Sequence, residues 1–331
     1  MVAPDGAGGE GTAGTAPAVV TVTLNPALDI TAEVEELVPY RKLRGRLVGV
    51  HPGGGGVNVA RVLHAFDIAV RAVVAVGGES GAGLVADLER EGVDVRPVQT
   101  GSDTRRSVTI WVRSTFEHFR ILVEGEPQDE VVWRTCLDAV GEAGSPAFVV
   151  LSGSMPPGVP TDAVGACAQR ARELGARFVC DTSGAALQAA AQAGADLIKP
   201  SRRELRDLVA PGQELEEFDH RDGARRAVAL GARAVVVSLG ADGAFLTTAD
   251  GVEADFASPE IDVVSSVGAG DSMVAGIVLG LLQGRPLPAA TRLGVAAGTA
   301  TCLEPGTALC RPEEVARLDA ELAQAAGSMS P

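Results

Sequence analysis

The sequence predicts an α/β fold in which a doubly wound, mostly parallel sheet carries a small inserted β lid. Three observations support this prediction. Short β-branched segments alternate with alanine-rich segments of helical period, several β-branched segments end in small or polar residues, and two stretches lack intervening helices. Such alternation is typical of parallel strands joined by helices that cover both faces of a sheet.

The expected strands are short apolar runs, and the expected helices repeat apolar residues with a period near 3.6. In chain order the strands are 19–24, 72–76, 148–151, 178–180, 197–198 and 234–239, and the clearest helices are 57–66 and 162–174. Ligands of open α/β sheets lie beyond the carboxyl ends of the strands. We therefore expect the functional site where these strands end.

Two stretches, 30–50 and 107–123, form the predicted lid, because they favour strands with no helix between them. The first carries four cations and no acid at 41–46, and Arg105-Arg106 adjoins the second. A charge run taken alone is usually a solvated face, and an anionic small molecule is the alternative. Residues 1–17 contain little to bury and are expected to be a disordered tail.

Composition excludes several classes of function. The formal net charge of −15 opposes nucleic acid or an anionic membrane as partner. No apolar stretch is long enough to span a bilayer and no signal peptide is evident, so we expect a cytoplasmic protein. Five cysteines without a C-x-x-C pair favour reduced core thiols over disulfides or a zinc site.

The segment Ser266-Val267-Gly268-Ala269-Gly270-Asp271 carries the strongest chemical signal. Its glycines allow close approach of a ligand, and the free N–H groups of the helix that follows can bind phosphate. A lone Asp271 would more often only favour the helix dipole. Beside a phosphate site, however, it can accept the proton of an attacking hydroxyl, and we interpret it as a general base.

A second glycine run, 53–56, directly precedes the helix at 57–66. It predicts either a hinge or close contact with a small ligand, and a lid can use both. The P-loop pattern G-x-x-x-x-G-K-[ST] is absent, which removes that class of NTPase. The run 81–86 fits a loose dinucleotide pattern and is interpreted as helix-start packing.

The chain resembles the ribokinase-like PfkB sugar kinases over about residues 19–320. The resemblance rests on four motifs in this order: Asn25-Pro26-Ala27-Leu28-Asp29, 53–58, Ser152–Gly158 and Gly268–Asp271. Within the family the chain is most similar to the PfkB-type 6-phosphofructokinases. That similarity rests on Lys42-Leu43-Arg44, Pro52–Gly56, Gly294–Gly298 and Gly306-Thr307.

The resemblance implies a ribokinase-like domain over 18–325 that transfers the ATP γ-phosphoryl group to O1 of fructose 6-phosphate. Asp271 would be the base, and Gly268, Ala269 and Gly270 the anion hole. The residues implied to bind the sugar phosphate are Asp29, Lys42, Arg44, Gly54, Gly55, Asn58, Arg105 and Ser154. Those implied to surround ATP are Lys199, Ser201, Ser238, Gly240, Gly243, Ser266 and Gly298.

The resemblance also implies Mg²⁺ and a monovalent cation, K⁺. Glu204 would act on Mg²⁺ indirectly, and the K⁺ loop would comprise Ser265, Val267, Thr301, Glu304 and Gly306. Two positions depart from the family pattern. Ser201 replaces the Asn of an Asn-x-x-Glu element, and Glu304 stands where Asn or a small residue is usual, so it either ligates the ion or points away.

A homodimer formed through the lid is implied as well. The alternatives inside the class are 1-phosphofructokinase and tagatose-6-phosphate kinase; the pair Gly54-Gly55 favours the 6-phosphofructokinase reading. Outside it are a non-catalytic sugar-phosphate sensor and a nicotinamide-dependent oxidoreductase that rests only on 81–86. Glycines alone do not distinguish ATP from an ADP or polyphosphate donor.

Overall fold

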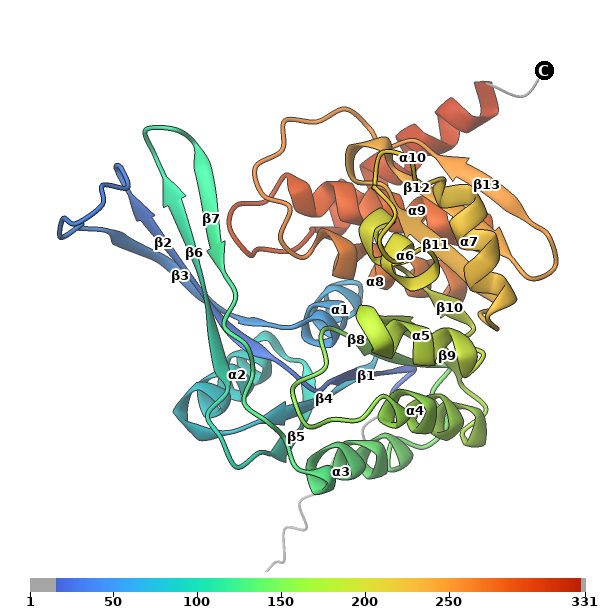
Figure 1. Cartoon of the computed structure of the whole chain (residues 1–331), viewed down its shortest axis with the longest axis horizontal. Coiled ribbons are helices and arrows are strands. Elements are labelled where there is room, and N and C mark those ends of the chain that lie inside the picture. Colours follow the sequence, from blue (N-terminus) through green and yellow to red (C-terminus); the bar gives the residue numbers. More distant parts are fainter. Residues whose placement is uncertain (1–15, 329–331) are drawn as a thin grey trace, which may run out of the picture.

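The computed structural model describes residues 16–328, so all but the last two residues of the expected tail lie outside the described part. The doubly wound sheet is confirmed, with nine strands (Figure 1). Across the sheet they are β13 (Glu253–Phe256), β12 (Ala244–Thr248), β11 (Ala234–Ser238), β10 (Leu197–Ile198), β9 (Arg177–Asp181), β8 (Phe148–Ser152), β1 (Val19–Thr23), β4 (Val70–Val76) and β5 (Asp94–Gln99).

The strands from β11 to β5 are parallel, and β12 and β13 are antiparallel additions at one edge. The chain order runs one way from β1 to β4 and β5, and the other way from β8 to β11. The reversal lies between β1 and β8. A crevice for a ligand is expected outside the carboxyl ends of these two strands.

Helices cover both faces of this sheet because successive strand side chains point to opposite sides. One apolar core includes side chains from α3 (Glu130–Gly141), α4 (Asp162–Glu173), α5 (Gly184–Gln192), α6 (Arg202–Val209) and α7 (His220–Ala229). The other includes side chains from α1 (Gly55–Ala65), α2 (Gly78–Glu91), α8 (Ala269–Leu282), α9 (Leu287–Cys302) and α10 (Pro312–Ser328). Within residues 16–328 one 3₁₀ turn, η1, covers Gly240–Asp242.

Helix α8 lies close against α9 because glycines meet at their crossing. A Cβ added to Gly276 would come 2.8 Å from Cα of Gly294, and one added to Gly294 would come 2.7 Å from the carbonyl oxygen of Met273. Backbone therefore packs on backbone, and neither position accepts a side chain without moving a helix. This contact fixes α8, whose first turn carries Asp271.

The lid is a separate four-stranded sheet in the order β3 (Arg46–Gly53), β2 (Ala27–Val34), β6 (Arg105–Val112) and β7 (Glu117–Ile121). It extends from one side of the main body (Figure 1). Its strands begin earlier than the expected stretches, at Ala27 and Arg105, and residues 35–45 form a loop between β2 and β3 rather than strand.

The lid has two unlike faces, as the strand period of two requires. Asp29 pairs with Ser107, and Thr31 pairs with Thr109, which places polar, buried side chains on one face. The alternate positions carry half-buried or exposed apolar side chains: Leu28, Ile30, Val50, Val108, Ile110, Phe119 and Ile121. The polar face continues into the crevice, and the apolar face has no cover in the described chain.

The five cysteines all lie in the described residues and are unpaired, as expected. Gly81 lies inside α2, where a Cβ would come 3.0 Å from Cβ of Val76 and 2.8 Å from Oγ1 of Thr104. It therefore packs the helix against a strand, which agrees with its interpretation as a packing residue. No helix in the part of the chain that the structure describes is both long and apolar enough to cross a membrane.

Candidate active site

The start of helix α8 is shaped by glycine. Gly268 is the N-cap with φ of 79°, a left-handed conformation that disfavours other residues. The Ala269 N–H donates to the Ser266 carbonyl at 3.4 Å, and the Gly270 and Asp271 N–H groups, which make no hydrogen bond within the described residues, are available to an anion. A Cβ on Gly270 would come 3.2 Å from Nζ of Lys199, so this turn also adjoins a cation. Negative charge can therefore be stabilised from two directions.

Asp271 stands in that turn and is half-buried. Its Oδ2 accepts a hydrogen bond from Nδ2 of Asn58 on α1, at 2.8 Å. Burial and the Asp181 carboxylate raise the pKa of Asp271 to about 7, against the opposing effects of Asn58, Lys199 and Arg120. A base that titrates near neutral pH can both hold and release a proton under cellular conditions.

Asp181 is a functional candidate that the sequence analysis missed. It ends β9, and its Oδ1 lies 3.1 Å from Nζ of Lys199, with both side chains almost completely buried. Burial raises the pKa of Asp181, and the charge of Lys199 opposes this rise. One signal could have found Asp181 in the sequence: it directly follows the predicted strand 178–180. Ligands of open α/β sheets lie beyond the carboxyl ends of the strands, and the same rule identified the other residues at strand ends.

Ser201 and Glu204 form a capping box at the start of α6. The Ser201 hydroxyl accepts from the Glu204 backbone N–H at 3.3 Å, and Oε2 of Glu204 accepts from the Ser201 N–H at 2.8 Å. Serine and asparagine are both good N-caps, so the departure at Ser201 keeps the local structure. The charge of Glu204 acts on both Asp181 and Lys199, which places its carboxylate beside the same cluster.

A cavity of about 840 Å³ opens beside the start of α8. Five of the residues expected around the nucleotide line it: Ser238, Gly240, Gly243, Ser266 and Gly298. Residues that the sequence analysis did not single out complete the wall: 258–263, Met273, Val295, Thr299 and Cys302. Most of these come from one irregular loop and from α9, where the sequence analysis assigned only Gly298 to the nucleotide. Lys199 and Ser201 lie outside this lining, and the Lys199 ammonium adjoins Gly270 at the start of α8.

Of the residues expected to bind the sugar, Gly54 and Gly55 lie at the switch point, against the segments that end β1 and β8. A Cβ on Gly55 would come 2.3 Å from Oγ of Ser152 and 2.6 Å from the Gly153 nitrogen, so glycine is required there. Gly54 has φ of 113°, which again favours glycine. Asp29 is buried against Gly53; burial raises the pKa of its carboxyl, and Arg120 and Arg105 oppose this rise.

Arg120 is a second residue that the sequence analysis missed. It lies on β7 opposite Thr109, and therefore on the polar face of the lid with Asp29. Its charge opposes the rise that burial causes in the pKa of both Asp29 and Asp271. Its side chain makes no hydrogen bond or ion pair with any residue that the structure describes. Arg120 is identified as a candidate site residue only by the pairing of β7 with β6, which is known once the lid sheet is described.

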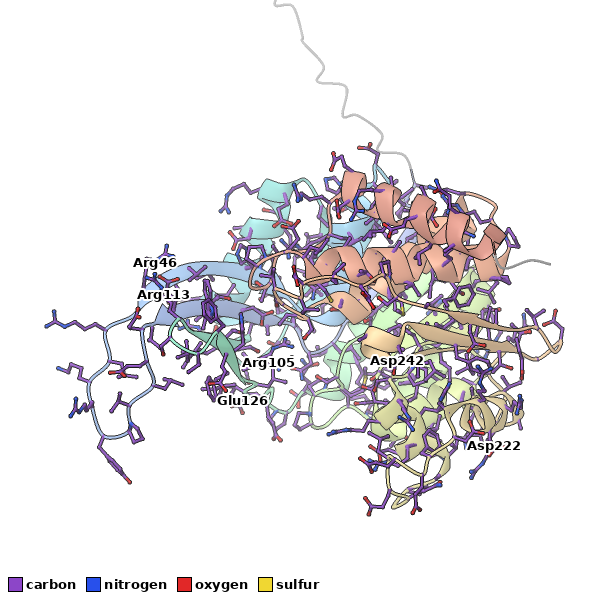
Figure 2. All side chains as sticks on the ribbon, turned by 90° about the horizontal axis from the view of Figure 1, so that it is seen from above. Arg46, Arg105, Arg113, Glu126, Asp222 and Asp242 are labelled. Carbon is purple, nitrogen blue, oxygen red and sulfur yellow. The ribbon has the colours of Figure 1, made fainter. Side chains whose placement is uncertain are left out.

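Three cations were expected to bind the sugar phosphate together: Lys42, Arg44 and Arg105. Within one chain the structure does not bring them into one cluster. Arg105 lies at the base of the lid, while strand pairing ends at Glu33 and Arg46, near the outer part (Figure 2). Glu33 is already about 13 Å further along the strand than Asp29, and Lys42 and Arg44 lie in the loop beyond. The family resemblance implied one cluster, and the extended strand separates Lys42 and Arg44 from Arg105.

The expected cation loop lies next to α8. Oγ of Ser265 donates to the Gly306 carbonyl at 2.6 Å, and the Thr301 hydroxyl donates to Oγ of Ser272 at 2.7 Å. Oε1 of Glu304 accepts from Nε of Arg311 at 2.7 Å, so this carboxylate is already paired. The buried Thr307 hydroxyl has no partner among the described residues. Carbonyl and hydroxyl oxygens of this kind fit a hard monovalent cation, and Val267 adds a carbonyl.

Comparisons with known proteins agree with this geometry. Residues 22–314 match the family described as pfkB family carbohydrate kinase. The chain is 41% identical over 303 residues to the ATP-dependent 6-phosphofructokinase isozyme 2 of Mycobacterium tuberculosis, covering 91% of this chain and 88% of that protein. It is 34% identical over 284 residues to the 1-phosphofructokinase of Bacillus subtilis, covering 86% and 92%.

A solved structure gives the same result. The phosphofructokinase-2 from Escherichia coli, determined in complex with potassium, superposes with a TM-score of 0.86 at 36% identity, covering 92% of this chain and 99% of that chain. The similarity therefore includes the lid and the main body together.

Proposed function

Because this chain belongs to the pfkB family of carbohydrate kinases, we propose that it transfers the γ-phosphoryl group of ATP to O1 of fructose 6-phosphate. The single observation that carries this proposal is Asp271, a half-buried carboxyl whose pKa is raised to about 7 at a helix start that can bind phosphate. The relatives named 6-phosphofructokinase, one of them 41% identical, support the choice of sugar.

In the proposed reaction, Asp29 and Asn58 hold the sugar hydroxyls beside the start of α8. Asp271 accepts the proton of the attacking hydroxyl as the new O–P bond forms and the bond to ADP breaks. The first amides of α8 and the Lys199 ammonium stabilise the negative charge of the transferred group. The polar face of the lid, with Arg120, covers the reacting atoms and limits hydrolysis by water.

Two ions are part of the proposal. Asp181 and Glu204 present carboxylates next to Lys199, and oxygen ligands of this type suit Mg²⁺. Mg²⁺ would neutralise the donor phosphates when bound. K⁺ would be held by carbonyl oxygens of the loop that contains Ser265 and Gly306. A cytoplasmic location stays a prediction from the sequence.

The proposal is tested by measuring ADP release with Mg-ATP against fructose 6-phosphate, fructose 1-phosphate, tagatose 6-phosphate and fructose, each with and without K⁺. Preference for fructose 6-phosphate is the expected result. Preference for fructose 1-phosphate would move the protein to the function of the 34% identical relative. Binding without turnover of any of the four would favour a sugar-phosphate sensor.

The acid limb of the pH profile should report Asp271. Since the base must be ionised and the pKa of Asp271 is about 7, kcat/KM is expected to rise with pH and level off above neutrality. In Asn58→Ala the hydrogen bond that lowers this pKa is lost, and the limb should move to higher pH. A limb that stays in place would contradict the assignment of Asp271 as the titrating base.

We also propose that the lid pairs with the lid of a second copy. The apolar face that includes Ile30, Ile110, Phe119 and Ile121 is left uncovered, and burying such a surface favours association. A pair of lids would also bring the loop with Lys42 and Arg44 to the active site of the second copy. There these cations would bind the phosphate of the sugar, which they do not reach in the site of their own chain.

Subunit mixing tests this arrangement. A Lys42→Ala, Arg44→Ala chain and an Asp271→Asn chain should each have little activity, and a reassociated equal mixture should recover up to about a quarter of the wild-type activity, because half of the dimers then contain one intact site. The control mixes Asp271→Asn with Lys199→Met, two lesions of the same site. Equal recovery in both mixtures, or none in the first, would contradict the proposal.

A further inference from the structure

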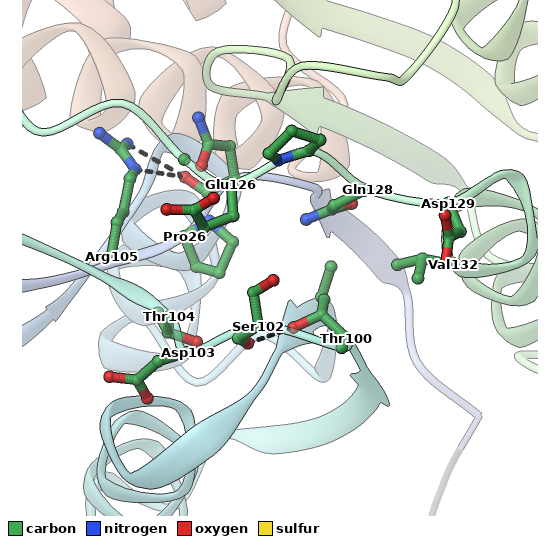
Figure 3. A pocket seen from close by; sticks show the side chains of 15 residues that line it. Pro26, Thr100, Ser102, Asp103, Thr104, Arg105, Glu126, Gln128, Asp129 and Val132 are labelled. Carbon is green, nitrogen blue, oxygen red and sulfur yellow. Dashed lines mark hydrogen bonds between the residues drawn. The ribbon is translucent and has the colours of Figure 1, made fainter.

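Asn25 lies where the main sheet, the lid and the loop after β8 meet. It follows β1 and is 9% exposed. Neither the reaction nor the nucleotide requires it directly, yet it contacts two residues expected to bind the sugar phosphate. Figure 3 shows Arg105 reaching this junction beside Pro26, above the small polar cavity that Asn25 also lines.

The Asn25 side chain determines what the Ser154 hydroxyl can do. Its Nδ2 donates to Oγ of Ser154 at 3.0 Å. Its Oδ1 faces Gly125, where an added Cβ would come within 2.3 Å, so the segment after the lid packs directly on the amide. Since the Ser154 oxygen is already an acceptor, its own proton is free to be donated to another group.

The Asn25 backbone orients a second donor. Its carbonyl accepts from Nη2 of Arg105 at 3.1 Å and from Nε at 3.4 Å, while Nη1 donates to the Val123 carbonyl at 3.0 Å. These bonds leave one N–H on each terminal nitrogen of Arg105. Ser154 and Arg105 come from different sheets, and Asn25 is the residue that both contact.

We propose that Asn25 is a positioning residue that orients these two donors, the Ser154 hydroxyl and the Arg105 guanidinium, towards the phosphate already present on the sugar. A phosphate monoester presents only acceptors at neutral pH, so it matches a hydroxyl and a guanidinium that both donate. An unphosphorylated sugar places a neutral hydroxymethyl group there and gains less binding free energy from these two donors. The inference rests on the proposed function and adds the reason for selecting a phosphorylated sugar.

Asn25→Asp tests the inference because it keeps the shape and reverses the hydrogen bond. The carboxylate only accepts, so Ser154 turns its proton towards residue 25 and no longer offers it to substrate. KM for fructose 6-phosphate should rise roughly tenfold to a hundredfold, with smaller changes in kcat and in KM for ATP. The preference for fructose 6-phosphate over fructose should fall by a similar factor.

Ser154→Ala separates this effect from charge and folding. If Asn25 acts through the hydroxyl, Asn25→Asp should cost much less in the Ser154→Ala background than alone. The matched control is Gln128→Glu, because Nε2 of Gln128 donates to the Leu24 carbonyl in the same junction at 2.7 Å but does not touch Ser154. It should leave KM for the sugar phosphate near the wild-type value.

The outcomes are distinct. The inference is wrong if Asn25→Asp raises KM equally in the wild-type and in the Ser154→Ala background. It is also wrong if Gln128→Glu raises KM as much as Asn25→Asp does. Neither result would contradict the proposed kinase activity. If Asn25→Asp does not fold, Asn25→Ala keeps the test and should give a smaller rise that also depends on Ser154. If the wild type turns over no sugar phosphate, the proposed function fails, and the same comparison made by calorimetric binding of fructose 6-phosphate still decides the role of Asn25.

Discussion

Asp271→Asn is expected to lower kcat by about a hundredfold to ten-thousandfold, the range that general base catalysis contributes. The amide keeps the shape of the side chain but cannot accept the proton of the attacking hydroxyl. Steady-state kinetics with fructose 6-phosphate and ATP measure the loss. Binding of the sugar phosphate should change little, because Asp29, Gly55 and Arg105 remain in place.

The stability of the same variant provides the control. The pKa of Asp271 is raised from 3.8 to about 7, so the folded protein binds this proton more tightly than the unfolded chain. The ionised carboxyl therefore costs stability, and the cost grows as pH rises from 4 through 7. Asp271→Asn should unfold at an equal or higher temperature than the wild type at pH 8. Near-normal turnover in a folded variant would refute Asp271 as the base.

Lys199→Met is expected to impair both folding and catalysis. The change removes the cation 3.1 Å from the buried carboxylate of Asp181 and leaves that charge unpaired, which costs about 3–5 kcal/mol in comparable cases. It also removes the ammonium next to Gly270, and loss of one such group at a transferred phosphoryl lowers kcat by about a hundredfold to a thousandfold. Denaturant unfolding and single-turnover kinetics measure the two effects.

The double variant Lys199→Met, Asp181→Asn separates the two effects. With the carboxylate neutralised as well, no unpaired charge stays buried, and most of the lost stability should return. Activity should remain low, because both the cation at the phosphate and a carboxylate expected to serve Mg²⁺ are gone. Recovery of activity together with stability would show that Lys199 acts only on the fold.

The sequence could predict the parts of the site that lie within one contiguous segment. Gly268 to Asp271 lie at a single helix start, so glycine spacing alone indicates the chemistry that we propose for them. The same holds for 53–58 and for the capping box of Ser201 and Glu204. Strand ends could be predicted too, because apolar runs bounded by small residues have a local signature.

The tertiary structure decided how these segments act on one another. Asn58 and Asp271 are 213 positions apart, and their hydrogen bond, with the charge of Asp181, exists only after α1, β9 and α8 pack together. Arg120 lies on the site's face of the lid because β7 pairs with β6. Lys42 lies away from the site because β2 is extended and places the loop that follows it at the outer end of the lid. The amino-acid sequence by itself determined the fold class and indicated the groups that we propose to react, since both follow from local pattern. The pKa of the base, the pairing of Lys199 and the position of each cation depend on burial and on charges from distant segments, and those are properties of the folded chain.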